Sequence, residues 1–264
     1  MNKPTFFELV QLNKSFGGLK AVNQLTFAVK EKEIFSIIGP NGAGKSTIFN
    51  CINGLYNPEQ GQIKFKGEDL VGKRPDQIAK AGIARTFQNL ELFAHMTTLD
   101  NILLGRHNSM KASILATVGL SFKRSKAAQE ELAHRRKVEE IIDFLELESA
   151  RDQFVSNLPY GKQKLVELGR ALALEPDLLL LDEPAAGLTQ EERNDMIFWI
   201  RDIRDLLGIT VVLIEHNMQM VQNISDRILA INFGTQITVG TPEEVLNHPE
   251  VIKAYLGENI PSTH

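Results

Sequence analysis

Residues 39–47, G-P-N-G-A-G-K-S-T, determine how the rest of the chain is interpreted. They directly follow the apolar run I-F-S-I-I at residues 34–38 and precede a short helical pattern that reaches Ile52. In the pattern G-x-x-x-x-G-K-S, glycines leave backbone N–H groups free to turn inward, where they, the helix N-terminus and Lys45 can surround a polyphosphate. A glycine-rich turn without such a role has no reason to end in Lys-Ser. The stretch therefore predicts a nucleotide-binding loop.

Every residue of this loop is a candidate for nucleotide binding: Gly39, Pro40, Asn41, Gly42, Ala43, Gly44, Lys45, Ser46 and Thr47. Ser46 comes first on the expected helix, so its hydroxyl would lie where a phosphate-bound Mg²⁺ sits.

The composition is that of an ordinary globular chain. Of the 264 residues, 43% are hydrophobic and 23% are charged, which allows a large core and predicts one domain with two lobes. The net charge of −4 argues against nucleic acid as the main partner. The single cysteine, Cys51, permits no intrachain disulfide, suits a reducing compartment and is interpreted as a small buried hydrophobe.

No uncharged apolar run approaches the roughly 18 residues that a membrane span needs, and the N-terminus has no apolar signal segment. We therefore expect a cytosolic chain. The nearest approach, Ala112 to Phe122, is flanked by lysines and is interpreted as a buried helix.

Alternating apolar residues at 6–16 and 25–29 predict antiparallel strands ahead of the loop. Phe16, just before a turn, could offer a flat face to adenine or could be a half-buried strand residue. Residues 92–156 change to helical periodicity. We predict an α/β fold in which residues 1–91 and 157–264 form a P-loop ATPase core with an antiparallel β lobe and C-terminal helices, and residues 92–156 form an inserted helical subdomain.

Polar residues follow three further predicted strands. The apolar run 177–181 ends in Asp182 and Glu183, the run 210–214 ends in Glu215 and His216, and the run from Ile83 ends in Gln88. Parallel α/β sheets bind their ligands at the carboxyl ends of the strands. In a phosphate-loop protein, Asp182 would face Mg²⁺ and Glu183 would reach the attacking water. Taken alone, the glutamine and the histidine could equally be solvated or core residues.

Together these features resemble the nucleotide-binding subunit of the ATP-binding cassette transporters over nearly the whole chain. Gly39 to Thr47 is similar to the Walker A loop, Gln88 to the Q-loop glutamine, Leu180 to Glu183 to the Walker B strand with its catalytic glutamate, and His216 to the switch histidine. Phe16 matches the position that stacks on adenine. The resemblance implies catalytic roles for Glu183, His216 and Gln88, and Mg²⁺ binding by Ser46, Gln88 and Asp182.

The segment Leu158 to Gln163, L-P-Y-G-K-Q, stands where the family has its signature L-S-G-G-Q. Pro159 replaces the serine whose hydroxyl would touch the γ-phosphate, and Tyr160 replaces the first glycine. The resemblance implies that Tyr160, Gly161 and Gln163 still contact nucleotide, because a helix N-terminus attracts anions. The D-loop also departs from the family pattern, with Thr189 where aspartate is usual.

The resemblance implies a head-to-tail dimer with a second cassette, identical or different, in which each ATP lies between one chain's Walker A loop and the other's signature. It also implies membrane-spanning permease subunits as partners and a place at the inner face of the cell membrane. The L-P-Y-G signature and the run Asp182 to Leu188, D-E-P-A-A-G-L, are most similar to importers of branched-chain amino acids.

Three alternatives remain open: a urea-type importer, a lipopolysaccharide exporter and a soluble cassette ATPase without transport. The absence of long heptads and of a second cassette argues against the soluble class.

Overall fold

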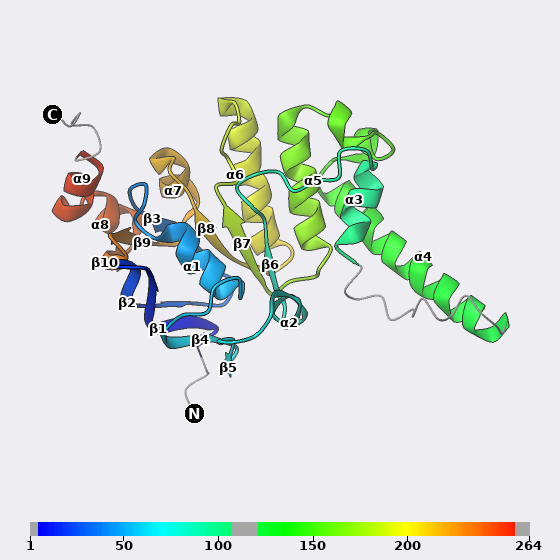
Figure 1. The fold of residues 1–264 in the computed structure, drawn as a ribbon. Helices are drawn as coiled ribbons and strands as arrows, with labels where there is room; N and C mark the ends of the chain where they lie inside the picture. The colour runs from blue at the N-terminus through cyan, green and yellow to red at the C-terminus, as the bar shows by residue number, and fades with distance from the viewer. Residues whose placement is uncertain (1–4, 107–120, 257–264) are drawn as a thin grey trace. The chain divides into compact units, whose positions relative to one another are not determined.

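The computed structural model describes residues 5–106 and 121–256 (Figure 1). The chain forms two compact units, one of residues 1–85 and 177–264 and one of residues 86–176. The apolar stretch Ala112 to Phe122 lies, up to residue 120, outside the described residues.

The first unit contains two β-sheets. The four-stranded antiparallel sheet has the order β2-β1-β4-β5 and is built from β1 Phe7–Phe16, β2 Leu19–Val29, β4 Gln60–Phe65 and β5 Glu68–Asp69. The six-stranded sheet has the order β10-β9-β3-β8-β7-β6. Its strands are β3 Ile34–Ile38, β6 Ile83–Arg85, β7 Leu178–Asp182, β8 Thr210–Ile214, β9 Arg227–Asn232 and β10 Thr235–Gly240.

The six-stranded sheet is parallel except for its edge strand β10, which pairs antiparallel with β9. Every residue of β3, β7 and β8 is buried, as their uninterrupted apolar sequences require for central parallel strands. Because these strands are neighbours and run the same way, their carboxyl ends meet at one edge of the sheet. The phosphate loop, Asp182 and His216 follow those ends.

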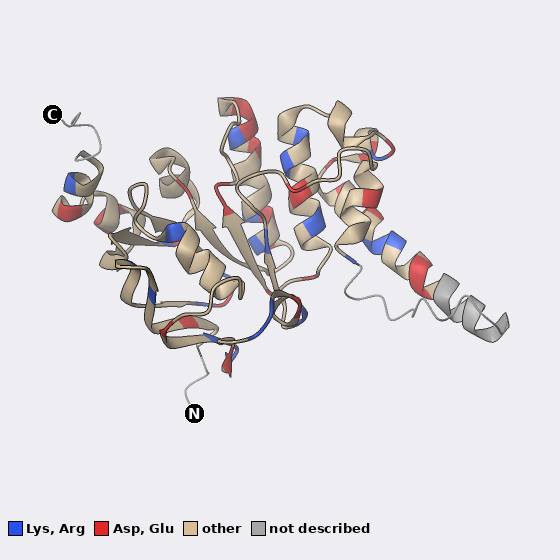
Figure 2. Ribbon diagram, in the orientation of Figure 1, with Lys and Arg blue, Asp and Glu red and all other residues tan. Residues whose placement is uncertain are grey.

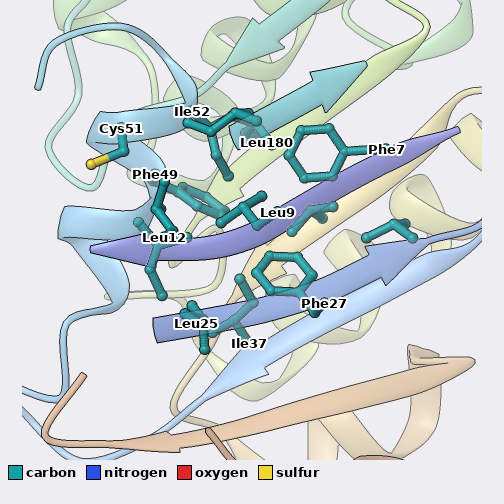
Figure 3. Packing of buried hydrophobic residues seen from close by; sticks show 14 of the residues in the cluster. Phe7, Leu9, Leu12, Leu25, Phe27, Ile37, Phe49, Cys51, Ile52 and Leu180 are labelled. Atoms are coloured by element: carbon teal, nitrogen blue, oxygen red, sulfur yellow. The ribbon is translucent and has the colours of Figure 1, made fainter. Parts of the chain in front are cut away.

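The described residues of this unit form the helices α1 Lys45–Ile52, α2 Pro75–Lys80, α6 Gln190–Asp205, α7 Met218–Ile224, α8 Pro242–Leu246 and α9 Pro249–Leu256. Phe49 and Ile52 of α1 share one apolar cluster with side chains of both sheets, among them Leu9, Ile37 and Leu180 (Figure 3). The helix that follows the phosphate loop is therefore fixed by the main core. Cys51 lies in the same cluster, and burial raises the pKa of its thiol to about 11, in agreement with its interpretation as a buried hydrophobe.

The described residues of the second unit are mainly helical, with α3 Thr98–Leu104, α4 Ser121–Phe144, α5 Tyr160–Leu172 and the short 3₁₀ turns Glu148–Ala150 and Val155–Asn157. Thr97 caps α3 by accepting a hydrogen bond from the Asp100 N–H, as its capping-box spacing suggests. Acidic and basic residues are interleaved along α6 and along the part of α4 from residue 129 onward, and they do not gather in one patch there (Figure 2). This pattern is typical of solvated helix faces.

The α/β class and the P-loop core are as predicted, but the second unit is longer than the helical stretch 92–156. Residues 86–91 and 157–176 belong to it as well. The reason is packing: α5 lies against α3 and α4, and its side chains bind the backbone of residues 87, 88 and 91.

Candidate nucleotide site

The phosphate loop runs from the end of β3 into α1 and is closed by backbone geometry that only glycine adopts easily. Gly44, the N-cap of α1, has φ +104°, and a Cβ there would lie 2.2 Å from the Ala21 carbonyl oxygen. A Cβ at Gly39 would lie 2.3 Å from the carbonyl oxygen of Ile231. Both glycines are therefore required because other backbone approaches the loop closely.

Lys45 is held over the loop. Its side chain is buried, and its Nζ donates hydrogen bonds to the carbonyl oxygens of Gly39 at 2.6 Å and Pro40 at 2.9 Å. The turn of the β9–β10 hairpin supports the loop from outside, since the Gly234 N–H donates to the Ala43 carbonyl at 2.9 Å. The ammonium group of Lys45 is thus fixed by the backbone of the phosphate loop, as a polyphosphate site needs.

Asp182 ends β7 and is 4% exposed. Its Oδ2 accepts a hydrogen bond from Nη2 of Arg85 at 2.8 Å, and both side chains of this ion pair are 5% exposed. Nη1 of Arg85 also donates to Asn50 Oδ1 on α1 at 2.7 Å. One buried guanidinium therefore joins the phosphate-loop helix to the end of β7.

Glu183 and His216 lie in contact, although they are 33 residues apart. Nε2 of His216 is 2.7 Å from Oε1 of Glu183. The Glu183 backbone has φ +50°, and its N–H donates to the Ile214 carbonyl at 2.9 Å, which fixes the turn after β7 against the end of β8. A carboxylate held by an imidazole at the edge of a parallel sheet can accept a proton from a water.

Phe16 ends β1 and is 44% exposed. The edge of the Tyr56 ring approaches it with a centroid separation of 5.1 Å, and Nζ of Lys14 lies 5.2 Å from its centroid. The ring is supported by neighbours and still reaches solvent, which is compatible with stacking on a base.

Gln88 belongs to the second unit. The predicted strand from Ile83 to Gln88 is shorter than expected, because β6 ends at Arg85. Beyond this strand, the Phe87 N–H donates a hydrogen bond to Oε1 of Glu167 at 3.2 Å and not to a neighbouring strand. Gln88 is exposed, and its backbone carbonyl accepts a hydrogen bond from Nζ of Lys164 at 3.2 Å.

Pro159 is the N-cap of α5, so Tyr160 and Gly161 form its first turn. Nε2 of Gln163 donates to the Leu158 carbonyl at 2.9 Å. The proline therefore starts the helix as its fixed φ allows. The positions of Gln88, Tyr160, Gly161 and Gln163 are described within the second unit alone.

Two comparisons of sequence bear on this arrangement. The profile of the family described as "ABC transporter" matches residues 22–186, and that of the family described as "Branched-chain amino acid ATP-binding cassette transporter" matches residues 235–260. The chain belongs to the ATP-binding cassette transporter family. It is the nucleotide-binding, ATP-hydrolysing type of chain in that family.

This chain aligns with individual ATP-binding cassettes over almost the full length of both. The chain is 42% identical to "High-affinity branched-chain amino acid transport ATP-binding protein BraF" of Pseudomonas aeruginosa, covering 98% of this chain and 100% of that protein. It is 42% identical to the protein named LivG of Escherichia coli K12, covering 92% and 94%. A solved nucleotide-free ATP-binding cassette from an ABC transporter superposes with a TM-score of 0.83 at 32% identity, covering 95% of this chain and 98% of that one.

Sequence reasoning did not assign a role in this cassette to Arg85, Asn50 or Glu215. Each acts through a contact distant in sequence. The only available signal was a charged residue at the end of an apolar strand, which Arg85 and Glu215 both show.

Proposed function

We propose that this cassette powers the import of branched-chain amino acids. The observation that carries the proposal is the agreement of residues 235–260 with a family restricted to that class, beyond the ABC transporter match itself. Full-length identity of 42% to BraF supports the same solute class.

In this proposal, residues 39–47 bind the phosphates of ATP and Phe16 stacks on the adenine. Glu183 accepts the proton of the attacking water, while His216 holds that carboxylate and reaches the terminal phosphate. Gln88 senses the nucleotide from the second unit.

Mg²⁺ fits the donors at this site. Ser46 and Asp182 offer a hydroxyl and a carboxylate, the hard oxygen ligands that the ion prefers, and Gln88 would supply an amide oxygen. Over residues 5–106 and 121–256, no group of three or more His, Cys, Asp and Glu side chains is arranged to hold a metal alone. When bound, Mg²⁺ would neutralise charge on the phosphate oxygens.

We further propose that two cassettes pair head to tail, with Tyr160, Gly161 and Gln163 of one chain completing the site of the other. In the described part of the chain, no helix is long and apolar enough to cross a bilayer. By analogy with its relatives, whose names describe the ATP-binding proteins of transport systems, the proposed importer includes membrane-spanning permease subunits, with this chain on the inner face of the cell membrane. The solute would bind to those subunits and not to the cassette.

The test is uptake. Deleting this chain in a strain that lacks redundant importers should abolish uptake of labelled leucine, isoleucine and valine, and a plasmid copy should restore it. A copy carrying Glu183→Gln should not. Undiminished uptake after deletion would refute the solute class while leaving the ATPase assignment intact.

A further inference from the structure

Glu215, at the end of β8, is a buried carboxylate bound to two different turns. It is 4% exposed. Its Oε1 accepts a hydrogen bond from the Ala185 N–H at 3.0 Å, and its Oε2 accepts from the N–H groups of His216 at 3.0 Å and Asn217 at 3.2 Å. Three backbone donors therefore compensate the burial of this acid.

The two turns are the ones that carry Glu183 and His216. Ala185 lies two residues after Glu183, in the turn that leaves β7, and His216 directly follows Glu215. The side chains of Glu183 and His216 meet at 2.7 Å. The Glu215 carboxylate thus bridges the backbones from which this pair extends.

We propose that Glu215 is a positioning residue that sets the distance between Glu183 and His216. It is buried, and it acts by holding the turn after β7 against the turn after β8. A displacement of about 1 Å in a catalytic group can cost about 10²-fold in rate. This inference rests on the proposed roles of Glu183 and His216.

The competing explanation is that Glu215 only stabilises the sheet. Glu33 provides a matched control, because it is a second buried glutamate of the same unit, 5% exposed, at the opposite ends of the strands. Its Oε2 accepts from the Lys30 N–H at 2.6 Å, and its Oε1 pairs with Arg227 at 3.2 Å. Removing its charge disturbs the fold far from Glu183.

The experiment compares Glu215→Gln and Glu33→Gln with the parent, each assembled with its membrane subunits. The glutamine keeps the shape but replaces one acceptor oxygen with an NH₂ group, so one turn loses its hydrogen bonds. Thermal melting, the KM for ATP and kcat are measured for each. We expect Glu215→Gln to lower kcat at least about 10-fold with the KM for ATP within about twofold of the parent, and Glu33→Gln to lower the melting temperature with kcat within about twofold.

A kcat for Glu215→Gln within twofold of that for Glu33→Gln would overturn the inference, as would a parallel change in KM and kcat. If Glu215→Gln does not fold, Glu215→Asp, which keeps the charge but is one methylene too short to reach both turns, is judged by the same criteria. Failure of both to fold while Glu33→Gln folds would also overturn it, because the acid would then serve stability alone. Glu183→Gln distinguishes failure of this inference from failure of the proposed function. If Glu183→Gln hydrolyses ATP at the parent rate, the proposed function fails, whatever the result for the Glu215 variants.

Discussion

Lys45 is the residue on which nucleotide affinity should depend most directly, because it places a full positive charge inside the loop of residues 39–47. Charge-assisted hydrogen bonds are worth roughly 1.5–3 kcal/mol, so Lys45→Ala should weaken ATP binding about 10- to 100-fold. Calorimetric titration measures this affinity. Lys253→Ala, an exposed lysine of α9, is the control and should bind ATP like the parent. Equal affinities for all three proteins would contradict the assignment of the loop.

Arg85 should matter for stability as much as for the site, because its guanidinium is buried between Asp182 and Asn50. Arg85→Met removes one partner of a buried ion pair, which typically costs roughly 3–5 kcal/mol. Urea titration should show that loss in the free energy of unfolding.

The control is Arg74→Met, which breaks the pair of Arg74 with Asp76 on the surface. Its unfolding curve should coincide with that of the parent, since exposed ion pairs contribute little. Similar curves for the two variants would show that the Arg85 pair is not structurally important.

At the residue scale, the sequence suggested the polar groups at the strand ends as site residues and did not reveal the groups that contact them. Asp182, Glu183 and His216 could be found because each follows an apolar strand. Arg85 joins Asp182 across 97 positions of sequence, and Glu215 joins Ala185 across 30. No local sequence pattern predicts such contacts, because they form only when β6, β7 and β8 become neighbours in the sheet.

Among the elements, α5 shows how the side chains of a helix can form hydrogen bonds with the backbone of a nearby segment. Lys164, Glu167 and Arg170 lie at intervals of three along the helix and bind the carbonyl of Gln88, the N–H of Phe87 and the carbonyl of Glu91. The apolar pattern of residues 83–88 predicted a strand through Gln88, but hydropathy does not reveal where an N–H finds its acceptor. This helix explains why β6 ends at Arg85.

Glu167 in α5 should make stability depend on pH. Burial raises the pKa of its carboxyl above the ordinary value, with the nearby Lys164 acting in the opposite direction. An acid whose pKa is raised on folding contributes stability that is fully present below its unfolded pKa and is lost as the pH rises through its folded pKa. Relative to the neutral variant Glu167→Gln, the parent should therefore lose stability as the pH rises from about 4, near the ordinary glutamate pKa, to neutral.

Urea titrations of parent and variant at both ends of that range measure the effect. Glu140→Gln, which changes an exposed acid of α4, is the control and should show no such pH-dependent difference. If the parent gained stability relative to Glu167→Gln as the pH was raised, this result would contradict a raised pKa of Glu167 in the folded protein.

For the whole molecule, the order of elements was predictable and the unit boundary was not. The phosphate loop, the strand ending in Asp182 and the strand ending in His216 follow from local patterns, and the α/β core follows from them. The assignment of residues 157–176 depends on α5 packing against α3, which is a tertiary contact. The family resemblance therefore implied a helix that starts at the signature, but it did not show to which unit that helix belongs.

The proposed head-to-tail pairing can be tested at the same scale. Glu183→Gln should bind ATP but hydrolyse it about 10²–10⁴-fold more slowly, so an ATP-bound dimer should accumulate and be visible by size-exclusion chromatography with light scattering. Adding Lys45→Ala to this variant should strongly reduce the amount of dimer at the same ATP concentration, because ATP then binds about 10- to 100-fold more weakly.

Mixing experiments decide whether each site needs two chains. All chains carry Glu183→Gln; one adds Lys45→Ala, a second adds Gly161→Asp, and a third adds both changes. In a head-to-tail dimer of the first and second chains, the intact Lys45 of one meets the intact Gly161 of the other, so one of the two sites is whole. A dimer of the third chain with the Glu183→Gln parent has a defect in each site. Heterodimers, distinguished from homodimers of the Glu183→Gln parent by a different tag on each chain, should therefore form with ATP in the first mixture and fail in the second, although both mixtures contain the same number of substitutions. Equal dimerisation in the two mixtures would show that Lys45 and Gly161 do not share a nucleotide across chains.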